Sequence, residues 1–164
     1  MKPLVLLLAF LSIACMPTRR ANGQHFATTA SYHFGSGTDY LGVSLASNII
    51  TWNYRKVMFR GVLSYLEGSR NNTAGQVQTS NRIEMGLENR NGMITGTWLF
   101  NVIGASYVLT NRSLYDQTSV VKTRDNSWMF TFGLGTKISD ELAIMAKYIT
   151  GKDNGIRLAM EVRF

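Results

Sequence analysis

The final ten residues of the chain alternate between apolar and other side chains without a break. Successive side chains of a β-strand point to opposite faces of the sheet, so this alternation gives the strand one apolar and one polar face. The apolar face consists of Ile156, Leu158, Met160, Val162 and Phe164, and the other face of Arg157, Ala159, Glu161 and Arg163. Such a strand is typical of a β-barrel wall that meets lipid on its outside.

The same alternation recurs along the chain and predicts seven further strands. They fall at residues 24–34, 40–49, 55–67, 77–89, 93–109, 127–138 and 142–150. We place their branched and aromatic residues outside and their small and polar residues inside, the reverse of a soluble barrel of the lipocalin type. A hydrophobic content of 45% fits this arrangement, because only alternate residues face lipid. We therefore predict an all-β, eight-stranded, antiparallel up-and-down transmembrane β-barrel.

Some local features of this barrel depend on weaker signals. In the strand at 93–109 we expect Trp98, Phe100 and Val102 to face outward, because the opposite phase would leave the Asn101 amide in lipid without a partner. Glycine, asparagine and charged residues at 67–76 and 110–126 predict loops, and the second is the longest irregular stretch. Aromatic residues near the predicted strand ends predict interfacial girdles, and they include Tyr32, Tyr40, Tyr65, Tyr107 and Trp128.

The first 23 residues predict a secretory signal peptide, which leaves 24–164 as the barrel. Lys2 precedes an apolar run from Leu4 to Met16 that is shorter than the roughly 20 residues a membrane-crossing helix needs, and small residues at 21–23 suit a cleavage site. An alternative is lipidation of Cys15, because residues 12–15 loosely resemble a lipoprotein box. Cys15 is the only cysteine, so an intramolecular disulfide or a cysteine-based metal site is excluded.

Two stretches resemble bacterial outer-membrane β-barrels. The ending from Arg157 to Phe164 resembles the C-terminal assembly signal of these proteins, with Ala159 where glycine is usual and with a final aromatic residue. Together with Phe-Gly-Leu-Gly-Thr at 132–136, it resembles the small eight-stranded barrels of the adhesin and opacity type. The resemblance implies residence in the bacterial outer membrane, contact with outer-membrane lipid and lipopolysaccharide, and recognition by the assembly machinery through Val162 and Phe164. It also implies that external loops bind any extracellular ligand.

Charged residues at the inward positions predict a crowded interior. They are Arg60, Arg82, Glu84, Glu88, Lys137, Lys147, Arg157, Glu161 and Arg163. Eight strands enclose room for side chains or one small ligand, and buried charges persist when they are paired, so we expect a mutually paired network. We expect Arg60 to pair with Glu84, and Lys147 with Glu161. The alternative is that these charges line a narrow conduction path.

One group of residues near a predicted turn could carry chemistry. His33, Ser36 and Asp39 have the residue types of an acyl-transfer triad, although Ser and Asp are also common in turns, and we interpret His33 as a lumen-lining residue. The lipid A deacylases and palmitoyltransferases act from within small barrels. At 148–150 the chain has Tyr-Ile-Thr where the deacylases carry His-x-Ser, and it has no Asp-Ser pair, which the palmitoyltransferases carry.

These observations favour a non-enzymatic protein. The net charge of +7 includes no basic run longer than two residues, which argues against nucleic-acid binding, and no motif predicts a cofactor or a metal. We predict that external loops mediate surface interaction, adhesion or envelope integrity. The alternatives are a lipid A acyl hydrolase or transferase and a narrow, porin-like pore.

Overall fold

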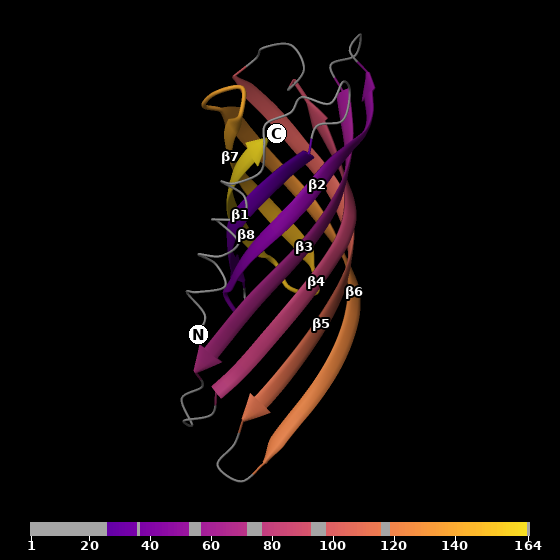
Figure 1. Cartoon of the computed structure of the whole chain (residues 1–164). Coiled ribbons are helices and arrows are strands. Elements are labelled where there is room, and N and C mark those ends of the chain that lie inside the picture. The colour runs from indigo at the N-terminus through magenta and orange to yellow at the C-terminus, as the bar shows by residue number, and fades with distance from the viewer. Residues whose placement is uncertain are drawn as a thin grey trace.

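The chain forms one closed antiparallel barrel (Figure 1). The computed structural model describes residues 26–35, 37–52, 57–71, 77–92, 98–115 and 119–163. The strands are β1 (Phe26–Gly35), β2 (Tyr40–Trp52), β3 (Val57–Asn71), β4 (Val77–Asn91), β5 (Leu99–Tyr115), β6 (Val120–Lys137), β7 (Leu142–Gly151) and β8 (Gly155–Arg163). Each strand pairs with the next, and β8 pairs with β1, which confirms the predicted eight-stranded fold.

Some sequence-based expectations fall on other parts of the chain. The predicted signal peptide at 1–23 with Cys15, the hydroxyl of Ser36 and the final Phe164 lie outside the described residues. Within the described residues, no helix has the length and apolar character that crossing a membrane requires.

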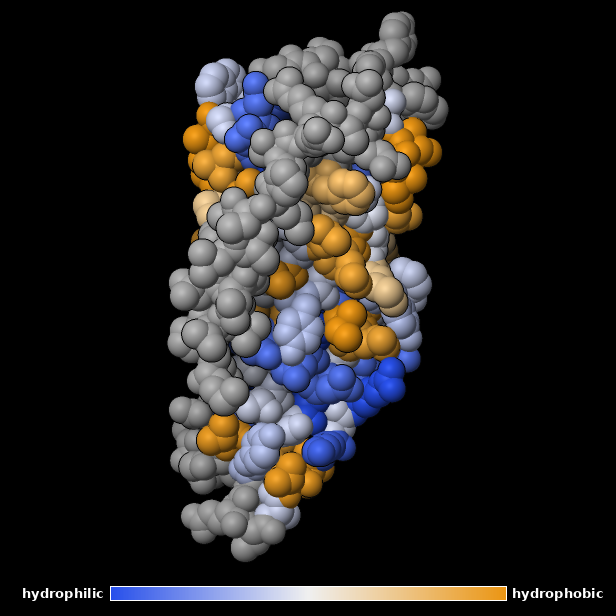
Figure 2. Space-filling model, in the orientation of Figure 1, coloured by the Kyte–Doolittle hydropathy of each residue, from blue (hydrophilic) through white to orange (hydrophobic). Residues whose placement is uncertain are grey.

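The outer wall of the barrel is apolar. Large apolar side chains point outward from it and are not covered by other parts of the chain, among them Leu45, Leu63, Met85, Ile103, Phe130, Phe132, Leu134 and Leu158. Figure 2 shows apolar residues gathered over the upper part of the visible face and hydrophilic residues gathered below them. An exposed apolar surface of this extent requires an apolar medium, so the wall is a lipid-facing belt.

Tyrosine hydroxyls mark one edge of this belt. The Tyr65 hydroxyl donates to Glu67 Oε1 at 2.8 Å, and the Tyr107 hydroxyl accepts from Asn126 Nδ2 at 2.9 Å. Rings with an apolar body and a hydrogen-bonded tip suit the membrane interface. Tyr40 was expected in this girdle, but its side chain is buried in the lumen and bonds to Ser80 Oγ at 3.0 Å.

The predicted phase of β5 was wrong. Phe100 and Val102 face the lumen with exposures of 3% and 0%, whereas Leu99 is 70% exposed. Asn101 does find a partner, because its Oδ1 accepts from the backbone N–H of Asn91 at 3.1 Å. The Phe100 ring also fits over Gly135 on β6, where a Cβ would lie 2.2 Å from Phe100 Cζ.

This packing gives a test of the observed phase. Replacing Gly135 by Ala should lower the free energy of unfolding by about 1–3 kcal/mol, because the new methyl group would overlap the Phe100 ring. The midpoint of urea unfolding in lipid vesicles, followed by tryptophan fluorescence, measures the change. Gly61→Ala is the matched control, since its Cβ would meet only Ile49 at ordinary contact distances, the nearest atom at 3.4 Å. Equal midpoints for the two variants would contradict the inward placement of Phe100.

Four neighbouring strands are longer than the others. β3 and β4 have 15 residues each, β5 has 17 and β6 has 18, whereas β1 and β7 have 10 and β8 has 9. Pairing of β5 with β6 continues to Tyr115 and Val120, but pairing of β6 with β7 begins only at Met129 and Gly151. Strands β3 to β6 therefore continue beyond the rest of the barrel, as Figure 1 shows, and we call this part the projecting sheet.

The projecting sheet corrects the two predicted loops. Most of 110–126 is strand, and β3 continues through Glu67 to Asn71. Alternating hydropathy reports contact with lipid, so a strand that leaves the membrane can carry polar residues on both faces and lose the signal. The strand pairing itself continues because the backbone groups of adjacent strands still satisfy one another.

Candidate functional site

The interior of the barrel contains a concentrated set of buried charges. Seven of the side chains singled out in the sequence are at most 9% exposed, namely Arg60, Arg82, Glu84, Glu88, Lys147, Arg157 and Glu161. They lie on β3, β4, β7 and β8, at positions whose side chains alternate with the lipid-facing ones. Charges removed from water in this way require ionic partners and hydrogen bonds.

The first group of charges surrounds Glu161 on β8. Arg60 Nη1 and Arg90 Nη2 each donate to Glu161 Oε2 at 2.8 Å, and Arg163 Nε donates to Oε1 at 3.1 Å. Arg90 also donates to Glu88 Oε2 at 2.9 Å, and Lys147 donates to Glu88 Oε1. We call these six residues the Glu161 cluster. A single carboxylate here holds three guanidinium groups from β3, β4 and β8.

The second group lies nearer the projecting end of the barrel. Arg157 donates to both oxygens of Glu84, at 2.7 and 2.8 Å. Arg82 pairs with Asp153 in the β7–β8 turn, and Arg112 Nη2 donates to the same carboxylate at 3.3 Å. We call these five residues the Glu84 cluster. The Arg82 guanidinium also lies over the Tyr40 ring, 4.2 Å from its centroid.

The structure corrects both predicted ion pairs. Arg60 is level with Glu88 across the β3–β4 pair and reaches over the bore to Glu161. Lys147 is level with Arg157 across the β7–β8 pair and bonds to Glu88. Strand tilt and register shift each residue relative to its neighbours, and a narrow bore lets long side chains meet across it. Neither the strand tilt nor the register can be read from the spacing of residues in the sequence.

Three further members of these clusters lie outside the charges named from the sequence. Arg90 falls after Asn89, where the fourth predicted strand ended, although it continues the phase of Arg82, Glu84 and Glu88. Arg112 and Asp153 fall in segments with loop-like composition. Of the three, only Arg90 could have been predicted, because the alternation of inward-facing residues continues from Glu88 to Arg90.

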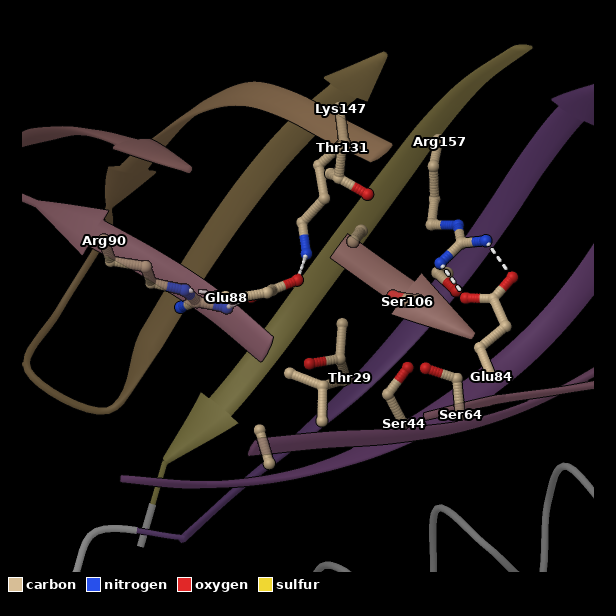
Figure 3. Close-up of a pocket in the computed structure, with 14 residues that line it drawn as sticks. Thr29, Ser44, Ser64, Glu84, Glu88, Arg90, Ser106, Thr131, Lys147 and Arg157 are labelled. Atoms are coloured by element: carbon tan, nitrogen blue, oxygen red, sulfur yellow. Dashed lines mark hydrogen bonds and ion pairs between the residues drawn. The ribbon is translucent and has the colours of Figure 1, made fainter. Parts of the chain in front are cut away.

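A small central chamber lies between the two clusters (Figure 3). Its volume is about 20 Å³ and its walls include Thr29, Ser31, Ser44, Ser64, Lys147 and Arg157. Thr29, Ser44 and Ser64 are level with one another on β1, β2 and β3, so their hydroxyls form one row, which Figure 3 shows beside Glu84. A cavity of this size can hold a water molecule or a small ion.

Apolar side chains fill the bore beside the charges, since Val102 is level with Arg90, Val108 with Glu84 and Ala143 with Glu161. One group consists of Phe100, Val102, Ala143, Met145 and Ala159, and the other of Val108, Met129 and Ile149. The interior is thus a packed core around the chamber.

His33 and Asp39, the two triad-like residues that the structure describes, are not hydrogen-bonded to each other. His33 is fully buried and lies level with Tyr40 on β2 and Arg157 on β8. Asp39 is exposed, where its oxygens accept from the Tyr32 hydroxyl at 3.4 Å and from the Gly35 N–H at 3.3 Å. No cluster of three or more His, Cys, Asp or Glu suited to a metal occurs in the described ranges.

The projecting sheet is the second candidate site. Val77, Tyr115 and Val120 lie level on β4, β5 and β6, so they form a row on one face, and their exposures are 42%, 44% and 52%. We call this the apolar row. In the described part of the chain, β6 from Val120 to Trp128 is paired on one side only, with β5, and leaves a free edge.

The lipid-facing belt, the paired interior and the closed eight-stranded topology define a transmembrane barrel of the bacterial outer-membrane class. Solved structures with this fold include Ail, the attachment invasion locus protein of Yersinia pestis, in complex with the heparin analogue sucrose octasulfate. That likeness has a TM-score of 0.57 and 10% identity over 86% of this chain and 96% of Ail.

Two further outer-membrane structures have the same fold. The N-terminal β-barrel domain of Pseudomonas aeruginosa OprF gives a TM-score of 0.56 at 14% identity, over 85% of this chain and 97% of that domain. Neisserial surface protein A gives 0.54 at 12% identity, over 85% and 94%. No protein-family model matches the chain. None of the curated proteins matches it in sequence.

Proposed function

We propose that this protein is a non-enzymatic surface protein of the outer membrane that binds an extracellular protein through its projecting sheet. The observation that carries the proposal is the apolar row at the far end of that sheet. Tyr115 lies eight residues beyond the interfacial Tyr107, which is roughly 26 Å along the strand at about 3.3 Å per residue. Exposed apolar side chains so far from the belt indicate a protein contact.

The free edge of β6 supports the same proposal. An unpaired strand edge offers backbone N–H and C=O groups to an added strand, which is a common mode of peptide recognition. Lys122 and Arg124 are exposed on this edge, while Asp125, which follows Arg124, pairs with Lys152. The fitting partner is therefore an extended protein segment with acidic side chains, followed by apolar ones that reach the apolar row. A role in attachment is also compatible with the name of Ail, the attachment invasion locus protein, which has the same fold.

The belt and the residues at 157–164 support two envelope partners. The belt contacts outer-membrane lipid, and Lys122 and Arg124 lie beyond Trp128, where phosphate groups of lipopolysaccharide would meet them. We further propose that the assembly machinery recognises Val162 and Phe164, with Val162 one residue before the end of β8.

The test uses cells that produce the barrel with Tyr115→Ser and Val120→Ser. Binding to a panel of purified extracellular-matrix proteins should fall at least tenfold, because the apolar row is lost while the strand pairing is kept. Ile138→Ser, an exposed apolar position at the opposite end of the barrel, is the matched control and should bind like wild type. A Tyr115→Cys variant should react with an impermeant maleimide on intact cells, which checks the orientation.

Two outcomes would contradict the proposal. Equal binding by the wild type and by the variant without the apolar row would remove the projecting sheet as the binding surface. A change in the acyl composition of lipid A when the barrel is produced would instead favour the enzymatic alternative.

A further inference from the structure

The central chamber has the chemistry of an anion site, and this inference is independent of the proposed surface partner. We propose that the chamber binds one small monovalent anion of the halide type, held by Lys147, Arg157 and the hydroxyl groups of β1 to β3. Three properties of the chamber favour such an ion, namely its charge balance, the donors that face it and its size.

The buried charges of the described lumen are unequal. Five cations are at most 7% exposed, namely Arg60, Arg82, Arg90, Lys147 and Arg157, and three carboxylates are at most 9% exposed, namely Glu84, Glu88 and Glu161. The half-buried Asp153 pairs with Arg82 and also accepts from Arg112, and adding Asp153 and Arg112 to the two counts leaves the imbalance unchanged. The walls of the chamber itself carry Arg90, Lys147 and Arg157 against Glu84 and Glu88. An excess of positive charge inside a lipid-embedded wall favours a bound anion, because the low dielectric strengthens its attraction.

The polar groups at the chamber are also mostly donors. Both oxygens of Glu84 already accept from Arg157, and both oxygens of Glu88 accept from Lys147 or Arg90. The Ser31 hydroxyl and the Arg157 Nε–H are buried without a hydrogen-bond partner in the described structure, and both residues line the chamber. The hydroxyl row of Thr29, Ser44 and Ser64 adds groups that can rotate to donate. A ligand that only accepts hydrogen bonds satisfies this set.

The size of the chamber suits a small anion. Space of about 20 Å³ for the centre of a water-sized particle is enough for one water molecule or one monatomic ion. A cation would add to the positive excess. Chloride is the halide available in ordinary media, and bromide is a probe of similar size that can be located by anomalous scattering.

The experiment uses the folded barrel with bromide as the only halide. Anomalous diffraction should show one bromide in the chamber, within hydrogen-bond reach of Ser31 and Arg157. The urea midpoint should rise with bromide concentration when gluconate keeps the ionic strength constant, because an ion that binds only the folded state stabilises it. Ser31→Ala should weaken the apparent bromide affinity about tenfold, the effect of one lost hydrogen bond to an ion.

A second variant tests the same site by filling it with a fixed negative charge. Ser31→Asp places a fixed carboxylate in the chamber, so its urea midpoint should no longer depend on bromide. Ser80→Ala removes a buried lumen hydroxyl that bonds to Tyr40 outside the chamber, and this control should respond to bromide like the wild type. The absence of an anomalous peak in the chamber would overturn the proposal. A peak without any dependence of the urea midpoint on bromide would indicate an adventitious ion only, and would overturn it too. So would a full bromide response in Ser31→Asp.

Discussion

Replacing Glu161 by Gln should lower the free energy of unfolding by about 3–5 kcal/mol, because removing one partner of a buried ionic group leaves the others uncompensated. Glu161 holds Arg60, Arg90 and Arg163 at distances of 2.8 to 3.1 Å, so an uncharged amide would leave several guanidinium groups without a countercharge. The urea midpoint in lipid vesicles and the heat-modifiable mobility of the barrel on gels would both record the loss.

The control for this prediction is a carboxylate that accepts a hydrogen bond but is exposed on the surface. Glu67 is exposed and accepts from the Tyr65 hydroxyl at 2.8 Å, so Glu67→Gln should change stability by less than about 1 kcal/mol. If the two variants unfolded at the same urea concentration, the Glu161 cluster would not be a stabilising part of the interior.

The wild-type barrel should carry almost no steady ion current in a planar bilayer, because its bore is filled. The Glu84–Arg157 and Glu88–Lys147 pairs cross the bore around a chamber of only about 20 Å³, and apolar groups pack beside the charges. Replacing these four residues together by Ser removes equal numbers of positive and negative charges and most of the side-chain volume. Brief openings should then appear in single-channel recordings.

The control replaces the exposed pair of Asp125 and Lys152 by Ser, which leaves the bore intact and should keep the barrel silent. A stable, large, salt-dependent conductance in the wild type would mean that the interior opens, and a pore function would then replace surface interaction as the favoured proposal.

The sequence by itself determined the topology of this barrel. The unbroken alternation at 156–164, and similar alternation in seven earlier segments, follows from a wall with lipid on one side, because every outward side chain of the belt must be apolar. The same constraint identified the inward charges of β3, β4, β7 and β8, since a charge on the lipid side would be too costly to keep. These features depend only on the order of residues along one strand.

The tertiary structure decided everything that depends on how one strand is placed against another. Phe100 faces inward because Gly135 across the β5–β6 pair leaves room for its ring, and Asn101 faces outward because Asn91 supplies its partner. Glu161 meets Arg60 across the bore because register and tilt set their levels. The projecting sheet continues past the belt on backbone pairing alone, where lipid no longer imposes a pattern on the side chains.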